Sequence, residues 1–480
     1  MRILMISAEG PPLQRSGALI DALDALPREL RARGHEVSVV IPFYREIRES
    51  FDFETRDTGV TVDVAVGENS YIAEFLVGRI TSGVQIFLVR CDAFFNREEI
   101  YGDPYEDNAA RFSFFNRAAV ELARRLTPSP DILHVHDWAA ALVPIIVRAG
   151  GLPFSTVLTI HRIAEQGSFW GLDFSLTNLP QRYFTLHGLE YFGRMNFLKG
   201  GILFADSITT VSDHFRREMM RPEFGCGLDP VLRENSHKIT GILDGADYTK
   251  WNPEIDKFLP ATFSASALAG KTQCRAELLS TMNLAPASHG PVFGMATGLV
   301  AEKGLGLLVP LLDRLLSDDV RLIILGDGDP AFETALAVAA RKYPGKFAYR
   351  NHYDERLAHL IEAGSDITLI PSRIEPSGMS AMHSLKYGAL PVARATGGIH
   401  EIIEDHDPML DTGYGFLCYV DSADGFWDSI KRAREIFEDR DTWVALMQRA
   451  MAREFSWESA AERYETVYQQ TLHASGTLAA

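Results

Sequence analysis

The chain has 480 residues, of which 46% are hydrophobic and 23% are charged. A chain of this length exceeds one compact core and predicts two globular domains. Its 47 lysine and arginine residues against 64 aspartate and glutamate residues give a formal net charge of −17. This charge argues against nucleic acid and against an anionic membrane as partners, and a bound nucleotide would need a local group of cations.

The cysteines and the apolar runs indicate the cellular compartment of the protein. The four cysteines form no CxxC pair, which disfavours a zinc site or a disulfide framework and fits a reducing compartment. The N-terminal apolar run is too short for a signal peptide, and no apolar run approaches the roughly 20 residues of a membrane span. We therefore expect a cytoplasmic protein without a metal site.

Strand-like apolar runs alternate with amphipathic helical stretches in the first half of the chain. Residues 3–7 read as a buried strand, residues 19–33 as a helix ending at Gly34, and residues 37–41 as the next strand, which makes a βαβ unit. Further strands are expected at residues 86–90, 132–135, 156–160 and 207–211. This alternation predicts a parallel sheet covered by helices on both faces.

A second α/β series follows a change of composition. Residues 244–260 contain two prolines, a glycine and an asparagine and read as a linker. Strands are then expected at residues 292–296, 321–325, 347–350, 367–370 and 389–393, with helices at 332–342 and 354–363 and a last helix at 457–472 capped by Ser456. We predict two doubly wound domains, whose ligands bind on loops after the strands, with the cleft between the domains as the default site.

The first such loop, residues 9–19, opens the first helix. Its small residues would expose backbone N–H groups at the positive end of the helix dipole, and Arg15 adds a cation, so it suits an anion. A plain turn capped by Ser16 explains the same residues equally well.

A second loop, His134-Val-His136-Asp137-Trp138, follows the strand at residue 132. Asp137 suits recognition of a hydroxyl group and Trp138 suits stacking on a sugar face. The alternative is a core histidine and an N-capping aspartate, and it is strongest for His134, which lies within the strand.

Four further strand exits carry polar or glycine-rich sequence. The pair His161-Arg162 precedes Gly167, and a charged residue there would be wasteful in a core. Glu375 lies between a strand and a helix that begins near Gly378, where the helix dipole favours a carboxylate or a phosphate. The turn at residues 326–329 permits a nucleotide to approach but is also a simple tight turn, and residues 394–398 form another glycine-rich exit.

Residues 291–304 read as an apolar strand that enters a loop with one cation, Lys303. A fixed ammonium group suits a phosphate, so this loop is a second candidate anion site. Gly298 lies in the same loop.

The order and spacing of these motifs from Met1 to about residue 470 resemble those of bacterial glycogen synthase and plant starch synthase, glycosyltransferase family 5, with the GT-B fold. The motifs that carry the resemblance are Tyr101-Gly-Asp, Asn196-Phe-Leu-Lys199-Gly-Gly, Ala205-Asp-Ser-Ile-Thr-Thr-Val-Ser212, Gly241-Ile-Leu-Asp244-Gly-Ala-Asp247, Trp251-Asn-Pro253, Glu375-Pro-Ser-Gly378, Thr396-Gly397-Gly398 and Phe455-Ser-Trp457-Glu. The resemblance implies an N-terminal domain of residues 1–247, a nucleotide-sugar domain of residues 248–455, and a C-terminal helix within residues 456–480 that packs back on the first domain.

The resemblance also implies an activity, which is metal-independent transfer of glucose from ADP-glucose to the non-reducing end of an α-1,4-glucan, with retention of the anomeric configuration. It implies that the leaving diphosphate helps to deprotonate the acceptor hydroxyl, while the protein orients the substrates and neutralises charge. No cofactor or metal is implied. The implied catalytic residues are Asp137, His161, Lys303 and Glu375, and the implied substrate-binding residues are Arg15, Ser16, Gly17, Ala18, Arg162, Asp244, Gly378, Met379, Thr396 and Gly397.

The departures from the family pattern cluster in the expected site. Arg15 replaces a lysine, Ala18 a glycine, Arg162 and Asp244 an asparagine each, Gly298 an arginine, and Ser377, a milder change, a cysteine. Loss of one charged partner in a closed site costs several kcal/mol, or roughly a hundredfold or more in rate. Ala18 would also restrict the loop if its φ were positive.

Three hypotheses follow from these departures. In the first, the protein is a working α-glucan synthase in which Arg162 or Arg15 replaces the lost arginine. In the second, it is a paralogue with a changed donor or acceptor. In the third, it is a catalytically weakened protein that binds glucan or regulates a partner, although the retained catalytic residues weaken this hypothesis.

Overall fold

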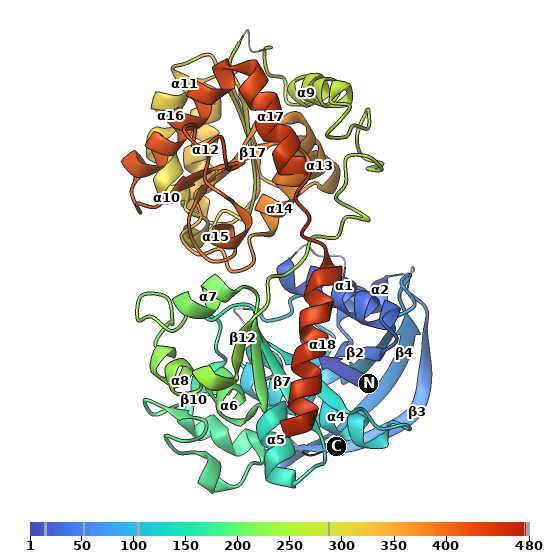
Figure 1. The fold of residues 1–480 in the computed structure, drawn as a ribbon. Coiled ribbons are helices and arrows are strands. Elements are labelled where there is room, and N and C mark those ends of the chain that lie inside the picture. Colours follow the sequence, from blue (N-terminus) through green and yellow to red (C-terminus); the bar gives the residue numbers. More distant parts are fainter. Residues whose placement is uncertain (14–16, 51–52, 103–105, 287–288, 475, 477–480) are drawn as a thin grey trace. The chain divides into compact units, whose positions relative to one another are not determined.

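The computed structural model describes residues 1–13, 17–50, 53–102, 106–286, 289–474 and 476. The chain divides into two compact units (Figure 1), Met1–Gly245 with Trp457–Ala480, and Ala246–Ser456. The domain boundaries predicted from the sequence lie after residue 247 and before residue 456. Within the described residues, no helix combines the length and the apolar composition needed to cross a membrane.

The N-terminal unit is built on a nine-stranded sheet in the order β12-β11-β7-β6-β1-β2-β5-β4-β3. From β12 to β5 each strand pairs in parallel with its neighbours. The expected strands of this half are present, so the alternating pattern predicted them correctly. The parallel strands are β1 (Arg2–Ile6), β2 (Glu36–Pro42), β5 (Gln85–Arg90), β6 (Ile132–His136), β7 (Ser155–Ile160), β11 (Ser207–Thr210) and β12 (Ile239–Gly241).

The predicted parallel sheet carries two antiparallel strands at one edge. Strands β3 (Thr55–Val66) and β4 (Asn69–Arg79) form a hairpin, and β4 pairs antiparallel with β5. A parallel connection needs a crossover of a dozen or more residues, whereas only Gly67 and Glu68 join these two strands. A small antiparallel sheet in the order β8-β10-β9, unassigned from the sequence, lies in the same unit and comprises β8 (Ser168–Trp170), β9 (Glu190–Tyr191) and β10 (Arg194–Asn196).

Helices and short 3₁₀ turns connect the strands of the N-terminal unit. The first of them, α1 (Ala18–Ala32), buries its leucines and presents polar residues outward, as its helical spacing predicts. The others are α2 (Arg45–Glu49), α3 (Asp92–Phe95), α4 (Asn108–Arg125), α5 (Val143–Gly150), α6 (Phe197–Phe204), α7 (Asp213–Glu218) and α8 (Asp229–Glu234), with 3₁₀ turns at Trp138–Ala140, Gly171–Thr177, Gln181–Tyr183 and Ser236–Lys238.

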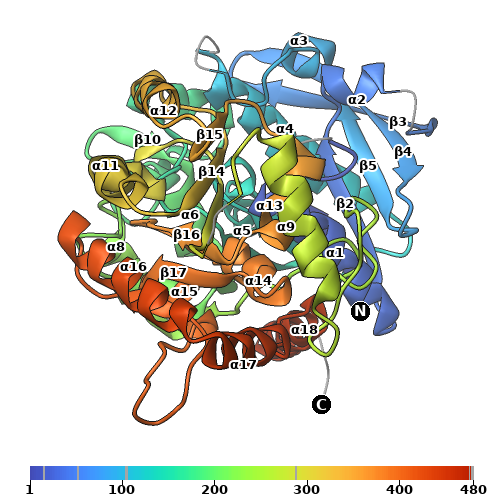
Figure 2. The ribbon, with the colours of Figure 1, turned by 90° about the horizontal axis from the view of Figure 1, so that it is seen from above.

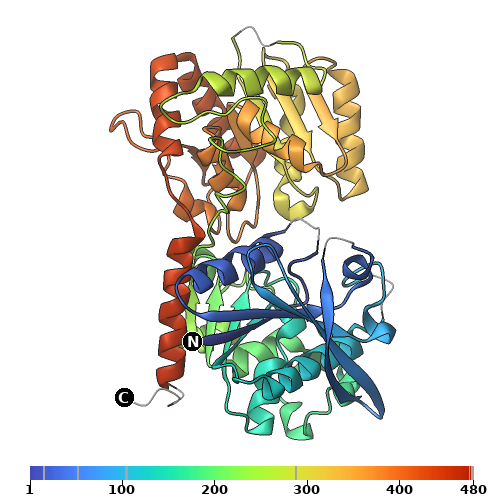
Figure 3. The ribbon, with the colours of Figure 1, turned by 90° about the vertical axis from the view of Figure 1, so that its right-hand side faces the viewer.

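The last helix, α18 (Trp457–Ala474), belongs to the N-terminal unit although it comes from the far end of the chain. It packs on α1 and β7, and Figures 1 and 3 show it in red alongside this sheet. Two of its side chains bond into the sheet: the Tyr468 hydroxyl lies 2.9 Å from His134 Nδ1, and Thr471 Oγ1 lies 2.7 Å from Ser207 Oγ. Residues separated by more than 250 positions therefore stabilise one core.

The C-terminal unit contains a six-stranded parallel sheet in the order β15-β14-β13-β16-β17-β18. Figure 2 looks down on it, and the labelled strands follow this order. All five strands expected from the sequence are present. The strands are β13 (Val292–Ala296), β14 (Arg321–Leu325), β15 (Phe347–Arg350), β16 (Ile367–Ile370), β17 (Leu390–Arg394) and β18 (Phe416–Cys418).

The helices of this unit cover its sheet on both faces, as a doubly wound fold requires. They are α9 (Ala269–Thr281), α10 (Leu305–Leu308), α11 (Leu312–Leu316), α12 (Pro330–Lys342), α13 (Glu355–Gly364), α14 (Met379–Lys386), α15 (Ile399–Ile402), α16 (Ala423–Glu438) and α17 (Arg440–Met451), with 3₁₀ turns at Ala301–Lys303 and Val309–Leu311.

A buried polar cluster fastens the segment that was read as a linker to the C-terminal unit. Trp251 stacks between the rings of His359 and His383, with centroid distances of 3.7 and 4.1 Å. The Asp256 carboxylate lies 2.7 Å from His359 Nδ1 and accepts the Tyr387 hydroxyl. Burial alone would raise the pKa of Asp256, but these hydrogen bonds lower it.

We expect Asp256→Ala to destabilise the C-terminal unit by roughly 3 kcal/mol, because it leaves buried donors without their acceptor. Urea unfolding of the purified protein measures the change. Glu254→Ala, at an exposed carboxylate two residues away, is the control and should leave the unfolding midpoint unchanged. Since the folded pKa of Asp256 is depressed, its contribution is complete above the ordinary aspartate pKa and is lost in more acidic solution. Equal midpoints for the two variants would contradict this assignment.

Candidate functional site

The residues predicted to form the site fall into two groups, one in each unit. Arg15 and Ser16 lie outside the described residues. The N-terminal group contains Gly17, Ala18, Asp137, His161, Arg162 and Asp244, and the C-terminal group contains Gly298, Lys303, Glu375, Gly378, Met379, Thr396 and Gly397.

Asp137 joins the loops that follow β6 and β7. Its carboxylate Oδ1 accepts the backbone N–H of His161 at 2.7 Å and that of Arg162 at 3.3 Å, so it is not the helix cap that was the alternative. Its backbone has φ of 55°, which non-glycine residues rarely adopt, and such strain is concentrated at functional sites. Burial raises the pKa of Asp137 to about 7, although the two amide hydrogen bonds oppose the change.

His161 is buried and bonded to a second buried histidine. Its Nε2 lies 3.1 Å from Nδ1 of His136, the last residue of β6. Burial lowers the pKa of His161 to about 3 and lowers that of His136 well below the usual range, so both rings are neutral at physiological pH. Neutral imidazoles can donate one hydrogen bond and accept another, but they cannot balance a phosphate charge.

The neighbouring residues Arg162 and Trp138 have different environments. The guanidinium group of Arg162 is exposed and lies 3.0 Å from the Glu165 carboxylate. Trp138 is buried, and its ring packs against those of Tyr101, Phe112, Phe169 and Phe197. The prediction that Trp138 stacks on a sugar was therefore wrong, because core packing covers its ring. The prediction that His134 is a core histidine is confirmed by its burial and its bonds to Thr159 and Tyr468.

Asp244, after β12, is a buried carboxyl group. Within the described residues neither of its oxygens has a hydrogen-bond partner. Burial, together with the negative charges of Asp21 and Asp137, raises its pKa well above the usual range. A protonated aspartic acid has nearly the shape of asparagine and, like it, can both donate and accept a hydrogen bond, but it has one donor hydrogen where the amide has two, so Asp244 in this state preserves part of the hydrogen-bonding capacity of the residue it replaces.

The start of α1 tolerates the substitution at Ala18. Ala18 is the first residue of the helix and has helical backbone angles, so the restriction considered for a positive φ does not arise. The Gly17 carbonyl accepts the Asp21 N–H at 3.0 Å, which begins the helical hydrogen-bond series.

In the C-terminal unit, Glu375 is the centre of a small charged network. One carboxylate oxygen, Oε2, lies 2.7 Å from Lys303 Nζ and accepts the Ser372 hydroxyl at 2.8 Å. Glu375 is buried while Lys303 is partly exposed. The ammonium group that was predicted to hold a phosphate therefore already contacts a carboxylate.

The loops after β16 and β17 are interlocked through glycines. The Gly398 N–H lies 3.0 Å from the carbonyls of Glu375 and Pro376. Gly397 has φ of 47°, and a Cβ there would lie 2.1 Å from the Glu375 carbonyl oxygen. Gly378, at φ of 73°, precedes Met379 at the start of α14, so a side chain at either glycine would be strained and would collide with the other loop. The sequence correctly placed these residues on adjacent strand exits.

Gly298 is an exposed residue just after β13, between the half-buried Thr297 and the buried Leu299. A Cβ atom at this position would meet nothing within 4 Å, so packing does not require glycine here. The residues on either side are held in place, because the Thr297 N–H donates to the Leu325 carbonyl at 2.9 Å and the Leu299 N–H to the Asp327 carbonyl at 2.7 Å. The local backbone could therefore carry an arginine without rearrangement.

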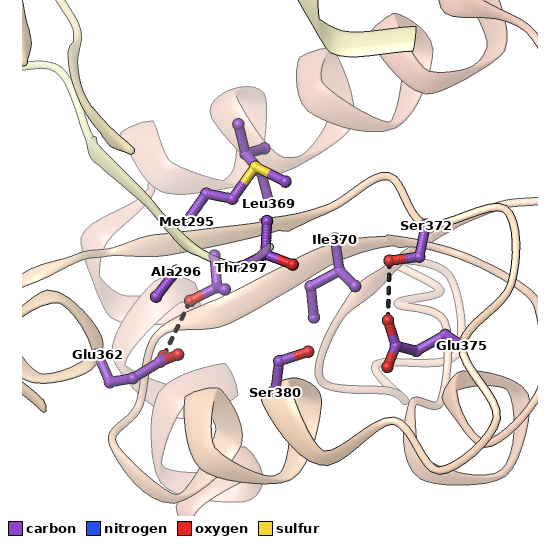
Figure 4. A pocket seen from close by; sticks show the side chains of 10 residues that line it. Met295, Ala296, Thr297, Glu362, Leu369, Ile370, Ser372, Glu375 and Ser380 are labelled. Carbon is purple, nitrogen blue, oxygen red and sulfur yellow. Dashed lines mark hydrogen bonds between the residues drawn. The ribbon is translucent and has the colours of Figure 1, made fainter. Parts of the chain in front are cut away.

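A small pocket, with room for about one water molecule, opens at the carboxyl ends of β13 and β16. Glu362 and Glu375 lie on opposite sides of it and Ser380 lies between them (Figure 4). The remaining lining residues are Met295, Ala296, Thr297, Thr368, Leu369, Ile370 and Ser372.

Glu362 was not predicted from the sequence. It lies in the last turn of α13, is buried, and accepts the Thr368 hydroxyl at 3.3 Å. Burial raises its pKa to about 8, so it is mostly protonated at neutral pH. The signal that could have revealed it is a lone acid in the otherwise uncharged segment Leu360–Gly364, which folding buries.

Comparison with known proteins matches each half of the chain to a glycosyltransferase family model. The family model described as "Starch synthase catalytic domain" matches residues 2–234, and that described as "Glycosyl transferases group 1" matches residues 283–446. Proteins named glycogen synthase from Koribacter versatilis (strain Ellin345) and Opitutus terrae (strain DSM 11246 / JCM 15787 / PB90-1) are 40% and 41% identical, over 98% of this chain and 98% and 100% of their own lengths.

Among solved structures, the catalytic domain of starch synthase IV from Arabidopsis thaliana, bound to ADP and acarbose, superposes with a TM-score of 0.90. It is 30% identical, and the match covers 98% of this chain and 99% of that one. The expected GT-B architecture of two Rossmann-like domains is thereby confirmed.

The two buried aspartates of the N-terminal group predict that folding stability depends on pH. The unfolded chain ionises both near pH 3.8, whereas the folded protein keeps Asp137 protonated to about pH 7, and the folded pKa of Asp244 is also well above its unfolded value. Folding stability therefore falls as pH rises, by about 1.4 kcal/mol per pH unit for each group between its unfolded and folded pKa. The stability of Asp137→Asn relative to the unmodified protein should rise with pH up to about pH 7 and then level off, and the relative stability of Asp244→Asn should also rise with pH.

Thermal melting between pH 5 and pH 9 measures both gains. Asp63→Asn, an exposed carboxylate on β3, is the control and should follow the unmodified protein at every pH. If all three variants melt in parallel with the unmodified protein, the two buried carboxyl groups are not held protonated.

Proposed function

The chain belongs to the glycogen and starch synthase family of glycosyltransferases, and we propose that it transfers glucose from ADP-glucose to the non-reducing end of an α-1,4-glucan, with retention of configuration. The observation that supports this proposal is that the residues expected to be catalytic are hydrogen-bonded in two pairs, Asp137 with the His161 amide and Lys303 with Glu375, near the substituted positions. The full-length identity of about 40% to proteins named glycogen synthase supports the same activity.

The roles of the N-terminal group follow from its hydrogen bonds. By accepting the amide of His161, Asp137 fixes the backbone that we place beside the anomeric carbon of the donor. Asp244, as a neutral acid, donates to one substrate oxygen and can accept from another. Arg15, Ser16, Gly17 and Ala18 would contact the diphosphate at the start of α1.

The roles of the C-terminal group rest on the loops around Glu375. Lys303 balances the distal phosphate, and its contact with Glu375 holds the ammonium group in position before the donor binds. Glu375 accepts hydroxyl groups of the glucosyl unit. The amides of Gly378 and Met379 at the start of α14, and the loop of Thr396 and Gly397, contact the donor on the nucleotide side.

The second and third hypotheses remain alternatives because the positive charge available to neutralise a bound diphosphate is reduced. A diphosphate needs more positive charge than Lys303 supplies, because Glu375 already contacts that lysine. Arg162 can supply it, since an exposed ion pair such as that with Glu165 contributes little and is readily exchanged for a phosphate. If no residue supplies it, the chain is a paralogue with another donor or acceptor, or a weakened glucan-binding or regulatory protein.

The decisive measurement is elongation of glycogen and of maltooligosaccharides by the purified protein with ADP-glucose or UDP-glucose. Elongation with ADP-glucose is the expected result. Elongation only with a different donor or acceptor identifies a paralogue, and glucan binding without turnover identifies a weakened protein.

Gly298→Arg should raise kcat/KM for ADP-glucose, by about tenfold or more if the diphosphate is under-neutralised, because the position has room for the side chain. Gly306→Arg is a matched control, since it adds the same charge to the same unit at another open, exposed glycine and should leave the rate unchanged. An unchanged rate in Gly298→Arg would mean that another cation already neutralises the donor.

Arg162→Ala tests whether that cation is Arg162. We expect kcat/KM to fall by roughly a hundredfold, with partial recovery in Arg162→Lys, which keeps the charge but not the forked geometry. Glu165→Gln removes the ion-pair partner without removing the cation and should retain full activity. A normal transfer rate in Arg162→Ala would assign the compensation to another residue or to none.

A further inference from the structure

The proposed mechanism assigns no role to His136, although it is the direct partner of His161. The two residues leave neighbouring parallel strands: β6 ends at His136, and β7 precedes His161. His136 Nδ1 and His161 Nε2 are 3.1 Å apart, and their rings are tilted by 30° with centroids 5.4 Å apart. Both side chains are buried.

This contact couples the proton positions of the two rings. Each ring is neutral, so each carries one N–H and one bare nitrogen, and in the hydrogen bond one ring must donate and the other accept. If His136 donates from Nδ1, His161 must carry its own proton on Nδ1. If His161 donates from Nε2, its Nδ1 is bare and the proton of His136 lies on Nε2.

The two arrangements differ in where they leave an unpaired N–H. Within the described residues, His136 Nε2 and His161 Nδ1 are both buried without a partner. The second arrangement would leave an N–H on His136, to which the proposed function assigns no substrate contact. The first leaves it on His161, which the proposed function places at the glucosyl site. Buried N–H groups without an acceptor are rarer than bare acceptors, which favours the arrangement that a substrate can satisfy.

His136 is itself held on both sides. Its ring lies 4.2 Å, centroid to centroid, from that of His134, and both nitrogens of His134 are engaged. His134 Nδ1 lies 2.9 Å from the Tyr468 hydroxyl of α18, and Nε2 lies 2.6 Å from Thr159 Oγ1, which in turn lies 2.6 Å from Thr209 Oγ1. Helix α18 therefore holds the ring of His134, which packs against His136.

We propose that His136 is a positioning residue that donates from Nδ1 to His161 Nε2 and thereby holds His161 as the Nδ1–H tautomer, with its one N–H kept for an oxygen of the substrate. The choice of tautomer and its effect on rate both rest on the proposed function, which places a substrate at His161, whereas the measurement of the tautomer needs no turnover. Without His136, the freed His161 Nε2 would compete for the proton and the donor would be present only part of the time.

Long-range ¹H–¹⁵N correlation spectra of protein labelled at histidine nitrogen measure the tautomer directly. The chain has 14 histidines, and the His161 signals are identified by their absence in His161→Gln. We expect the Nδ1–H pattern for His161 in the unmodified protein, unchanged between pH 5.5 and pH 8.5. In His136→Leu the pattern should shift toward Nε2–H, and His136→Asn, whose amide nitrogen can occupy the position of Nδ1, should restore it. His187→Leu, at an exposed histidine, is the control and should leave the His161 signals unchanged.

The same variants report on catalysis if the protein transfers glucose. We expect kcat/KM to fall about ten- to a hundredfold in His136→Leu and to recover largely in His136→Asn. An Nε2–H or doubly protonated His161 in the unmodified protein overturns the proposal, as does an unaltered tautomer in a folded His136→Leu protein. If His136→Leu does not fold, the unmodified protein and His136→Asn decide by themselves. If no donor is turned over, the spectra still test the tautomer, so failure of the proposed function and failure of this inference are distinguishable.

Discussion

The Asp137 carboxylate accepts the amide hydrogens of His161 and Arg162 from a strained position at the end of β6. This pair of bonds fixes the backbone after β7 relative to the backbone after β6, and the contact between His136 and His161 depends on the same alignment. Parallel strands bring their carboxyl ends to one edge of a sheet, but they do not fix the loops beyond that edge. A buried hydrogen bond does so, and the strain at Asp137 is tolerated because the surrounding structure compensates for it.

The loops of the C-terminal group are held relative to each other in a different way. Its loops are positioned by close packing of glycine against backbone, with Gly397 against the Glu375 carbonyl, and the charged pair of Lys303 and Glu375 lies on that rigid base. Rigid loops keep the electrostatic cost of reorganisation low when a charged donor binds. Gly298 thus lacks the positive charge of the family's arginine, while the backbone on either side of it keeps its hydrogen bonds.

The departures from the family pattern are not equivalent in physical terms. Ala18 fits because a helix begins there, and Asp244 retains part of the bonding of asparagine because burial and two neighbouring acids keep it protonated. Arg162 adds a cation to the N-terminal unit, and Gly298 removes one from the C-terminal unit. Two substitutions therefore keep most of the local chemistry, while two change the charge of the unit in which they lie.

The sequence by itself determined the two α/β series, most strand positions and the identity of the loops that carry polar residues, because hydrophobic periodicity is a local property of the chain. It failed where the outcome depends on residues distant in sequence. Trp138 was expected to stack on a sugar, but the ring of Phe197 packs against it. The sequence does not reveal that Glu362 is buried. The protonation of Asp244 depends on its burial and on the nearby Asp21 and Asp137. Only the tertiary structure decided burial, protonation and the contact between His136 and His161, because desolvation and hydrogen bonding act through space and not along the chain.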